Sequence, residues 1–232
     1  MRRALAVHRL GRIPYEEAMA LQQQVAEARH EELLGDTLLV LEHPRTVTLG
    51  RGASADDLLL PRELMQEAGI AVVDVGRGGG VTYHGPGQVV GYPIIDLKPD
   101  RMDVRKYVRS LEDTMIQTCR HYGIDAGTSA EGTAKYIGAW VEPHGHSPRK
   151  IGAVGVRLSR WITMHGFALN VDPLMADFTR IVPCGIRDRG VTSLALELEE
   201  APSFDEVMGV AIASFAELHG YDVSEFDGPP EL

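Results

Sequence analysis

AVVDVGRGGGVTYHGPGQVVGYPIIDL, residues 71–97, is the stretch that decides the fold class of this chain. Six of residues 76–88 are glycine. In a dinucleotide-binding loop a helix opens directly after the glycines, so that its N-terminus faces the phosphate. Here residues 81–83 are strand formers, and Pro86 prevents a helix soon after them. The glycines therefore join strands, and they let the backbone turn sharply and approach a ligand closely.

The rest of the chain alternates between strand and helix patterns without a strict strand–helix–strand order. Apolar runs predict strands, and apolar residues at spacings of three and four predict helices. The strands are expected at 37–41, 46–49, 71–75, 89–97, 136–141, 151–158 and 162–171, and the helices at 15–34, 62–68, 103–122 and 203–218. Asp103 can cap the third helix. We expect an α/β (α+β) fold, in which helices pack on a mixed β-sheet.

The chain gives few signs of a domain boundary. No repeat, low-complexity block or linker stands out, so residues 1–232 are expected to form a single domain. The alternative division places a small C-terminal subdomain from about residue 172. The last dozen residues are expected to be loosely held.

Composition limits the class of function. The 232 residues are 44% hydrophobic and 24% charged, as in ordinary soluble globular proteins. A net charge of −10 argues against general nucleic-acid binding, which needs an excess of Lys and Arg. No run is long enough for a signal peptide or a membrane span. With only two cysteines, a disulfide framework is not expected, and a reducing cytoplasm is the expected compartment.

Arg77 and His84 lie within the glycine-rich stretch. A turn without a ligand more often carries Asn, Asp or Ser. These two side chains therefore favour contact with a ligand, although a glycine-rich hairpin with no ligand is the alternative.

The two cysteines have different settings. Cys119 lies on the apolar stripe of a predicted helix and is expected to be a buried core residue. Cys184 lies in a Pro-Cys-Gly turn, where a thiol can meet a substrate. Lys150 opens an apolar strand and could stabilise a thiolate or move a proton. From the residues alone, Cys184 and Lys150 could still be structural, and His84 and His165 are rival partners for the thiol.

A metal site is not expected, although the chain has nine histidines. His144 and His146 are two apart in a loop, without Cys-x-x-Cys or His-x-x-x-His spacing. We expect both to be exposed to solvent.

Three blocks of sequence together resemble one enzyme family. They are RGGGVTYHGPGQVVGYPIIDL at 77–97, RKIGAVGVRLSRWITMHGFALNV at 149–171 and IVPCGI at 181–186, in the family's order, with LEHPRTVTLGR at 41–51 before them. They closely resemble the lipoyl(octanoyl) transferases, which move an octanoyl group from acyl carrier protein to a lysine of lipoyl domains. The resemblance implies an α/β domain related to the lipoate-protein and biotin-protein ligases.

The resemblance also implies roles for residues. Cys184 would carry the acyl group as a thioester, and Lys150 would lower the pKa of that thiol. The implied acyl-binding residues are Arg77, Gly78, Gly79, Gly80, Val81, Thr82, Tyr83, His84, Ala153, Val154, Gly155, His165, Gly166 and Phe167. No cofactor is implied, and Phe167, Val81 and Val154 would supply apolar wall to a chain whose buried methylenes each contribute about 0.8 kcal/mol.

The implied partners are octanoyl-acyl carrier protein as donor and, as acceptors, the lipoyl domains of 2-oxoacid dehydrogenase complexes and the glycine cleavage H protein. Because such partners are usually acidic, we expect a local basic docking surface despite the net charge of −10. Its expected members are Arg101, Arg105, Arg109, Arg149, Arg157 and Arg160.

Three other functions remain open from the sequence. An ATP-dependent lipoate-protein ligase would share the Gly-Gly-Gly and Tyr-His pattern but would not need Cys184. A non-catalytic acyl-binding module would bind octanoate and form no adduct. A cysteine hydrolase would need His84 or His165 beside Cys184 and would release free octanoate.

Overall fold

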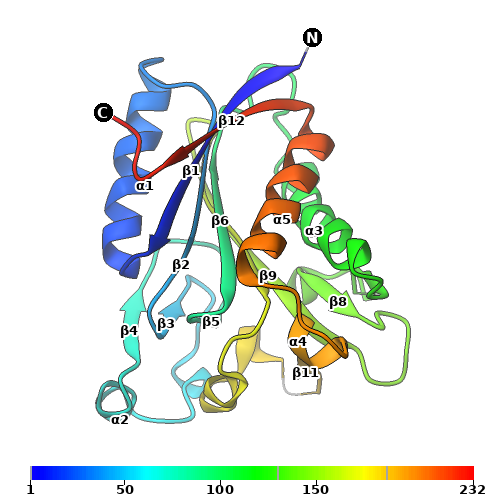
Figure 1. The fold of residues 1–232 in the computed structure, drawn as a ribbon. Coiled ribbons are helices and arrows are strands. Elements are labelled where there is room, and N and C mark those ends of the chain that lie inside the picture. The colour runs from blue at the N-terminus through cyan, green and yellow to red at the C-terminus, as the bar shows by residue number, and fades with distance from the viewer. Residues whose placement is uncertain (1, 130, 187) are drawn as a thin grey trace.

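The computed structural model describes residues 2–129, 131–186 and 188–232, and the side chains of residues 55, 134 and 184 lie outside this description. A mixed sheet runs through the centre of the described chain (Figure 1). Its strands are β1 (Arg3–Arg12), β2 (Thr37–Glu42), β6 (Gln88–Ile94), β7 (Ala126–Gly127), β8 (Ala139–Val141), β9 (Arg149–Ser159), β10 (Ile162–Asn170), β11 (Gly190–Val191) and β12 (Tyr221–Asp227). They follow the order β12-β1-β2-β6-β10-β9-β8-β7, and β11 pairs with β9.

The sheet combines parallel and antiparallel pairs, as the interleaved sequence pattern predicts. β1 pairs in parallel with both β12 and β2. The pairs β2–β6, β6–β10 and β10–β9 are antiparallel. The α/β class with a mixed sheet is therefore confirmed.

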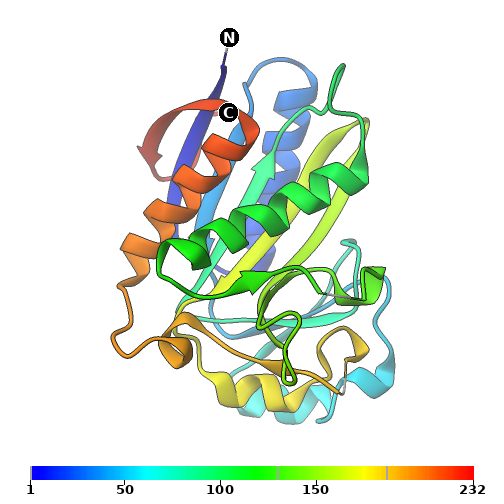
Figure 2. The same cartoon turned by 90° about the vertical axis from the view of Figure 1, so that its right-hand side faces the viewer.

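Helices cover both faces of this sheet. α1 (Tyr15–His30) packs on one face against β6 and β10, while α3 (Val104–His121) and α5 (Phe204–His219) pack together on the other, as Figure 2 shows. Every residue of β6 and β10 is buried, because helices enclose these central strands on two sides. The short helix α4 (Leu194–Glu197) and the 3₁₀ turn η2 (Ala134–Tyr136) complete this part of the fold.

A small second sheet lies at one end of the main sheet, below it in Figure 1. It consists of β3 (Thr46–Leu49), β4 (Ala71–Asp74) and β5 (Val81–His84), in the order β4-β3-β5. The helix α2 (Arg62–Glu67) and the 3₁₀ turns η1 (Ala55–Asp57), η3 (Met175–Arg180) and η4 (Pro183–Gly185) surround it. It has its own core, in which the rings of Tyr83 and Phe178 meet edge to face at 5.1 Å.

Local sequence signals set the ends of two helices. The Asp103 carboxylate accepts the first free N–H groups of α3, as predicted. Ser203 and Glu206 form a capping box at the start of α5, and Gly220 ends that helix with φ +70°.

Three expectations about elements are wrong. The helix expected at 15–34 ends at His30, and the strand expected at 136–141 is shared between η2 and β8. The last dozen residues are not loosely held, because β12 pairs with β1 from Arg3 to Arg9. The apolar pattern of β12 is weak since all but its first residue are exposed, and its partner lies at the other end of the chain.

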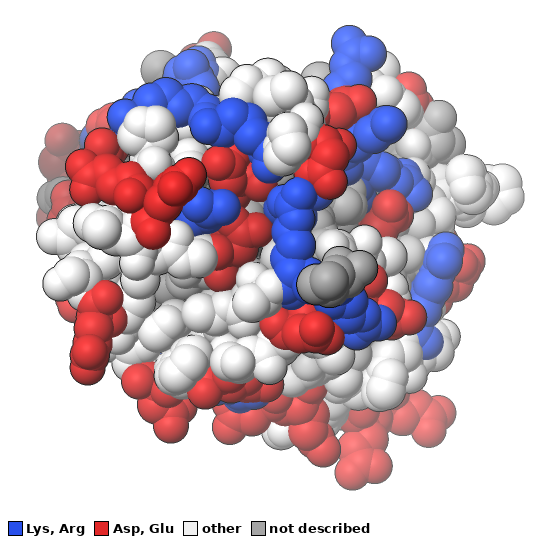
Figure 3. Space-filling model, turned by 90° about the horizontal axis from the view of Figure 1, so that it is seen from above, with Lys and Arg blue, Asp and Glu red and all other residues white. Residues whose placement is uncertain are grey.

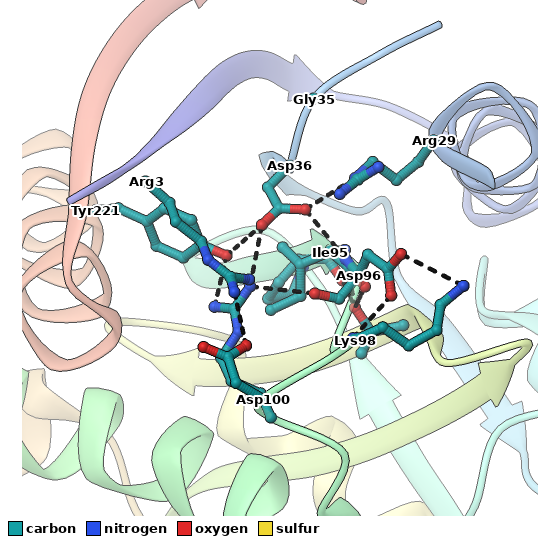
Figure 4. A network of polar contacts seen from close by, with 12 residues as sticks. Arg3, Arg29, Gly35, Asp36, Ile95, Asp96, Lys98, Asp100 and Tyr221 are labelled. Atoms are coloured by element: carbon teal, nitrogen blue, oxygen red, sulfur yellow. Dashed lines mark hydrogen bonds and ion pairs between the residues drawn. The ribbon is translucent and has the colours of Figure 1, made fainter. Parts of the chain in front are cut away.

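The strands β1, β12 and β2 meet around a buried carboxylate, Asp36 (Figure 4). It accepts hydrogen bonds from Arg29 Nε at 2.8 Å, Tyr221 Oη at 2.6 Å and Arg101 at 3.2 Å. The backbone N–H of Asp96 donates to it as well, at 3.0 Å. Burial raises the pKa of Asp36, but the donors outweigh burial and hold it below its usual value. Asp36 therefore stays charged and joins the N-terminal and C-terminal strands.

Acidic and basic side chains are intermixed on the face seen from above in Figure 3. Of the described helices, none combines the length and the apolar character that crossing a bilayer requires.

Candidate active site

A narrow pocket opens between the small sheet and the central strands. Its volume is only ≈ 30 Å³, about the room of one or two water molecules. It is lined by Tyr15, Arg77, Gly79, Thr82, His84, Tyr92, Ala153, Val154, Gly155, His165, Gly166, Phe167 and Ala168. Ten of the fourteen residues predicted to bind the acyl group are in this set, so segments 77–84, 153–155 and 165–167 do meet around one pocket.

The other four predicted residues, Gly78, Gly80, Val81 and Tyr83, are not part of the lining. Side chains of β5 alternate between two sides. Thr82 and His84 face the pocket, whereas Val81 and Tyr83 pack in the core of the small sheet. Val81, which was expected to form part of the acyl wall, therefore faces the core of the small sheet and not this pocket, because side chains along a strand alternate with a period of two residues.

The buried Arg77 forms one wall of the pocket. It is 5% exposed, and its guanidinium donates to the carbonyl and hydroxyl oxygens of Thr48, at 3.0 and 2.7 Å, and to the carbonyl of Gly78 at 3.0 Å. A Cβ at Gly155 would lie 3.0 Å from Arg77 Cδ, and one at Gly50 would lie 2.7 Å from its Nη1. Glycine at these positions therefore makes room for the arginine, which keeps a positive charge beside the pocket.

Neutral histidines and tyrosines form the polar side of the pocket. His43 contacts the Ile13 carbonyl through Nδ1 at 2.9 Å and the Tyr92 hydroxyl through Nε2 at 2.8 Å. The Tyr15 hydroxyl lies 3.4 Å from Nδ1 of His165. Burial lowers the pKa of both His43 and His165 to about 4, and nearby Arg77 adds to the effect on His165. Both rings are therefore neutral at pH 7.

His84 is also buried and neutral, because burial lowers its pKa well below the usual value. Its Nδ1 lies 2.7 Å from Gln88 Oε1. The Gln88 amide continues to Asn170 Oδ1 at 2.8 Å, and the Asn170 amide reaches the carbonyl of Thr192 at 2.9 Å. A chain of buried polar groups thus leads away from the pocket behind His84.

Lys150 is the second residue of β9 and is only 6% exposed. Its Nζ donates to the Ile137 carbonyl at 2.9 Å and lies 4.9 Å from the centre of the Trp140 ring. Gly138 is required next to this carbonyl: its φ is +140°, and a Cβ there would lie 3.2 Å from Lys150 Cε. The predicted buried lysine at the mouth of a strand is confirmed as a structural feature.

Cys184 belongs to the 3₁₀ turn η4, but its side chain lies outside the described residues. The turn packs against β5, which carries Thr82 and His84, and against η2, which directly precedes Ile137. The segments that carry the predicted nucleophile, the buried lysine and the pocket are thus brought to one end of the main sheet.

The backbone N–H groups that follow Cys184 are held within its own turn. The N–H groups of Gly185 and Ile186, which follow Cys184, donate to the carbonyls of Val182 and Pro183 at 3.1 and 2.9 Å. They do not point at a site for an oxyanion in this structure. Cys119 is fully buried, as expected, and burial raises the pKa of its thiol to about 12.

Sequence reasoning missed several groups around the pocket. Tyr15 and Tyr92 line it, and His43 holds the Tyr92 hydroxyl. Tyr92 and His43 lie within the sequence blocks at 77–97 and 41–51, and this position in the family-like blocks could have identified them. Glu112, on α3, accepts the N–H of Gly138 at 2.7 Å and so supports the segment that holds Lys150. Nothing in its local sequence distinguishes Glu112 from a surface residue of the helix.

The six arginines predicted to form a docking surface are mostly engaged within the chain. Arg101 pairs with Asp36, Arg109 with Asp113, Arg149 with Glu142 and Glu197, and Arg160 with Glu27. Arg105 and Arg157 form no ion pair with a described residue. Arg157 lies against Gly76, where a Cβ would be 3.2 Å from its Nη1, so it is the one of the six that lies beside the glycine-rich stretch.

His144 and His146 are exposed, as expected. Among the residues that the structure describes, no group of three His, Cys, Asp or Glu side chains is arranged to hold a metal ion.

The solved structures of known proteins establish the fold. Lipoate-protein ligase A bound with ATP superposes with a TM-score of 0.75 at 20% identity, covering 98% of this chain and 89% of that one. The biotin protein ligase from Aquifex aeolicus in complex with biotin and ATP superposes with a TM-score of 0.53 at 14% identity, covering 92% and 69%. At such identities the likeness concerns the fold alone, and it agrees with the fold expected from the sequence.

Sequence comparison establishes the family. The family described as lipoyl protein ligase A/B catalytic domain matches residues 14–216. An octanoyltransferase from Acidobacterium capsulatum is 43% identical over 233 residues, covering 96% of this chain and 93% of the relative. An octanoyltransferase from Myxococcus xanthus is 45% identical over 229 residues, and the match spans 98% of this chain but 62% of that longer relative. The chain therefore belongs to the lipoyl protein ligase A/B catalytic domain family and, within it, to the octanoyltransferases.

Proposed function

We propose that this octanoyltransferase moves an octanoyl group from acyl carrier protein to a lysine of a lipoyl domain through a thioester on Cys184. One observation carries the proposal. The turn η4, which bears Cys184, packs between β5 of the acyl pocket and η2, next to the carbonyl that receives Lys150. A nucleophile, a buried amine and an acyl pocket at one place are what transfer through an acyl-enzyme requires.

In the first step the Cys184 thiolate attacks the carbonyl carbon of the octanoyl thioester. A new carbon–sulfur bond forms, the bond to the carrier sulfur breaks, and the carrier thiolate takes up a proton. One thioester replaces another, so the step is nearly isoenergetic and needs no ATP. Lys150 supports it as a buried cation, held by the Ile137 carbonyl and the Trp140 ring.

In the second step the amine of the acceptor lysine attacks the acyl-enzyme. The carbon–nitrogen bond of the amide forms, the bond to Cys184 sulfur breaks, and the proton lost by the amine ends on that sulfur. Lys150 can carry this proton, because it is left neutral when it gives its own proton to the carrier thiolate in the first step.

The acyl chain would lie between Val154 and Phe167, along the apolar part of the pocket lining. Each buried methylene contributes about 0.8 kcal/mol to binding. The pocket of ≈ 30 Å³ is too small for eight carbons as it stands. Entry of the chain therefore requires the residues that line the pocket to rearrange.

Docking of protein partners would rest on Arg105 and Arg157 rather than on the four arginines that already form ion pairs. We assign the acceptors to lipoyl domains, including those of 2-oxoacid dehydrogenase complexes and the glycine cleavage H protein. A free thiol nucleophile works best in a reducing compartment, which supports the cytoplasm as its location.

We also propose that residues 1–232 act as one catalytic domain. The segment after residue 172 contributes α5, which packs on α3, and β12, which pairs with β1. These contacts support a shared core.

The test is transfer from octanoyl-carrier to a lipoyl domain in the absence of nucleotide, followed by mass spectrometry of the acceptor. The wild type should add one octanoyl group to one acceptor lysine. Cys184→Ser should lower the rate at least about 1,000-fold, because a serine hydroxyl loses its proton far less readily than a thiol and is a weaker nucleophile. Transfer that depends on ATP and free octanoate, and that survives in Cys184→Ser, would instead identify a ligase.

A further inference from the structure

The hydrogen bonds in the chain of polar groups behind His84 can each be assigned a donor and an acceptor. This holds although the oxygen and nitrogen of an amide, and the two nitrogens of the imidazole ring, are similar in shape. The chain runs from His84 Nδ1 through Gln88 and Asn170 to the Thr192 carbonyl, at 2.7, 2.8 and 2.9 Å. All four residues are at most 6% exposed. Buried polar groups of this kind hold each other in one arrangement, because breaking any link leaves a polar atom without a partner.

A backbone carbonyl can only accept a hydrogen bond, and this fixes the direction. The Thr192 carbonyl must therefore face the NH₂ of Asn170, which leaves Asn170 Oδ1 facing Gln88. Gln88 must then present its own NH₂ to that oxygen, and this NH₂ also reaches the Tyr83 carbonyl at 3.3 Å. Gln88 Oε1 is left facing His84, so His84 Nδ1 must carry the hydrogen.

We propose that Gln88 and Asn170 are positioning residues that hold His84 in the tautomer with hydrogen on Nδ1, so that Nε2 offers an unprotonated acceptor to the amine that attacks the acyl-enzyme. This inference rests on the proposed function for its substrate. The ring of His84 lines the acyl pocket, and its Nδ1 is already taken by Gln88. Nε2 is therefore the nitrogen that the ring can offer to a bound group.

An amide at position 88 suits this role better than a carboxylate. A carboxylate beside Nδ1 would favour the imidazolium, which has no acceptor nitrogen. Gln88 accepts from Nδ1 without adding a charge, and burial keeps the pKa of His84 well below its usual value. The neutral ring can accept from an N–H of the amine, but it cannot donate to the thioester oxygen.

The same chain is connected to the strand of Lys150. The N–H of Thr192 donates to the Lys150 carbonyl at 2.9 Å, while the Thr192 carbonyl receives Asn170. Hydrogen bonds through Thr192 thereby connect the backbone of Lys150 to the residues that position His84. In the second step the acceptor amine forms the carbon–nitrogen bond while one N–H points at His84 Nε2. The carbon–sulfur bond breaks, and the proton ends on the sulfur. The first step involves no acceptor amine and does not need this contact.

The tautomer can be measured on the free enzyme, without any activity. Long-range ¹H–¹⁵N spectra of protein labelled with ¹⁵N-histidine distinguish a protonated from an unprotonated ring nitrogen. The His84 signals are those that vanish in His84→Gln. We expect a protonated Nδ1 and an unprotonated Nε2 at pH 7.5. A protonated Nε2 in the wild type would overturn the proposal, whatever the enzyme transfers.

The kinetic arm uses Gln88→Met, which keeps the shape of the side chain and removes its hydrogen bonds. Loss of one buried hydrogen bond should slow the aminolysis half-reaction about 10-fold and change acylation of the enzyme less than about 2-fold. The His84 spectrum should show mixed tautomers. Asn170→Leu, which breaks the next link, should act in the same direction if Gln88→Met folds poorly.

The matched control is Gln117→Met, the same substitution at a partly exposed glutamine of α3 whose amide donates to Glu217 Oε2. It should change neither half-reaction nor the His84 spectrum. Equal slowing of both half-reactions in Gln88→Met, or an altered tautomer with unaltered aminolysis, would contradict the positioning role. Absence of octanoyl transfer in the wild type would count against the proposed function and leave the tautomer result standing.

Discussion

Buried polar groups lie at both ends of strand β2, and they are charged and paired at one end but neutral at the other. Before it lies Asp36, whose charge is matched by Arg29, Arg101 and two further donors (Figure 4). After it lies His43, which belongs to a group of buried neutral rings with His84 and His165. At the first end every charge is compensated, and the result is a rigid junction of strands. At the second end the rings are uncharged because they are buried, and their polar atoms can form hydrogen bonds with a substrate.

Acidification should have the largest effect on the free energy of unfolding, and it acts through the buried histidines rather than through Asp36. The pKa of His43 and His165 is about 4 in the folded protein, compared with 6.5 for an exposed histidine. Below pH 6.5 the unfolded chain gains protons that the folded one does not, so stability is complete above pH 6.5 and is lost as pH falls toward 4. Each histidine should cost roughly 2 kcal/mol between pH 7 and pH 5. Urea unfolding at pH 7, 6 and 5 measures this loss.

The Asp36 carboxylate itself should not contribute in that range, whereas the buried His219, which stacks on Tyr221 and whose pKa is lowered to about 4, should behave like the histidines of the pocket. The pKa of Asp36 is held below the usual 3.8, so its stabilisation persists down to pH 5. A free energy of unfolding that is the same at pH 7 and pH 5 would mean that the histidines of the pocket are not neutral and buried as described.

Removal of the charge at the first end comes next in size. Asp36→Asn should lower the free energy of unfolding by about 3 kcal/mol, because two arginines lose their buried counter-charge. Removal of one partner from a buried ion pair usually costs about 3–5 kcal/mol, and the lower value applies since these arginines are 19% and 22% exposed. The rate of octanoyl transfer per folded molecule should not change. Asp113→Asn breaks the exposed pair with Arg109 and should cost less than about 0.5 kcal/mol. Equal costs in the two variants would contradict the contrast between them.

A smaller effect is expected from the glycine under Phe167. A Cβ at Gly91 would lie 2.4 Å from Phe167 Cζ, so Gly91→Ala must displace that ring, which lines the pocket proposed to bind the acyl chain. We expect a loss of about 1–3 kcal/mol in stability and a lower rate of enzyme acylation. Gly209→Ala in α5 is the control, since a Cβ there meets nothing within 4 Å. It should raise stability by about 0.5–1 kcal/mol and leave acylation unchanged. Normal acylation in Gly91→Ala would argue against Phe167 as an acyl wall.

The fold class and the segments that meet at the pocket could be predicted from sequence, but the contrast between the two ends of β2 could not. The interleaving of strand and helix patterns without a strict order indicated a mixed sheet, and the resemblance of three blocks indicated which segments meet at the pocket. The pairing of β12 with β1 could not be predicted, because an exposed strand has no apolar pattern and its partner is more than 200 residues away. The junction at Asp36 depends on that pairing and was hidden with it.

Side-chain direction was the other limit. The blocks named Val81 and Tyr83 together with Thr82 and His84, and only the pleat of β5 separates them into core and pocket. Gln88 and Asn170 lie within the recognised blocks, but their roles follow from contacts between distant segments. The ion pairs of Arg101 and Arg149 likewise depend on Asp36 and Glu197, which no local pattern connects to them.

The most direct measurement is the intact mass of the enzyme after mixing with octanoyl-carrier and no acceptor. The wild type should gain one octanoyl group, located at Cys184 by fragmentation, and Cys184→Ala should gain none. Cys119 should stay unmodified, because burial raises the pKa of its thiol to about 12. An adduct on Cys119, or a wild type that transfers octanoyl without ever carrying it, would contradict the account.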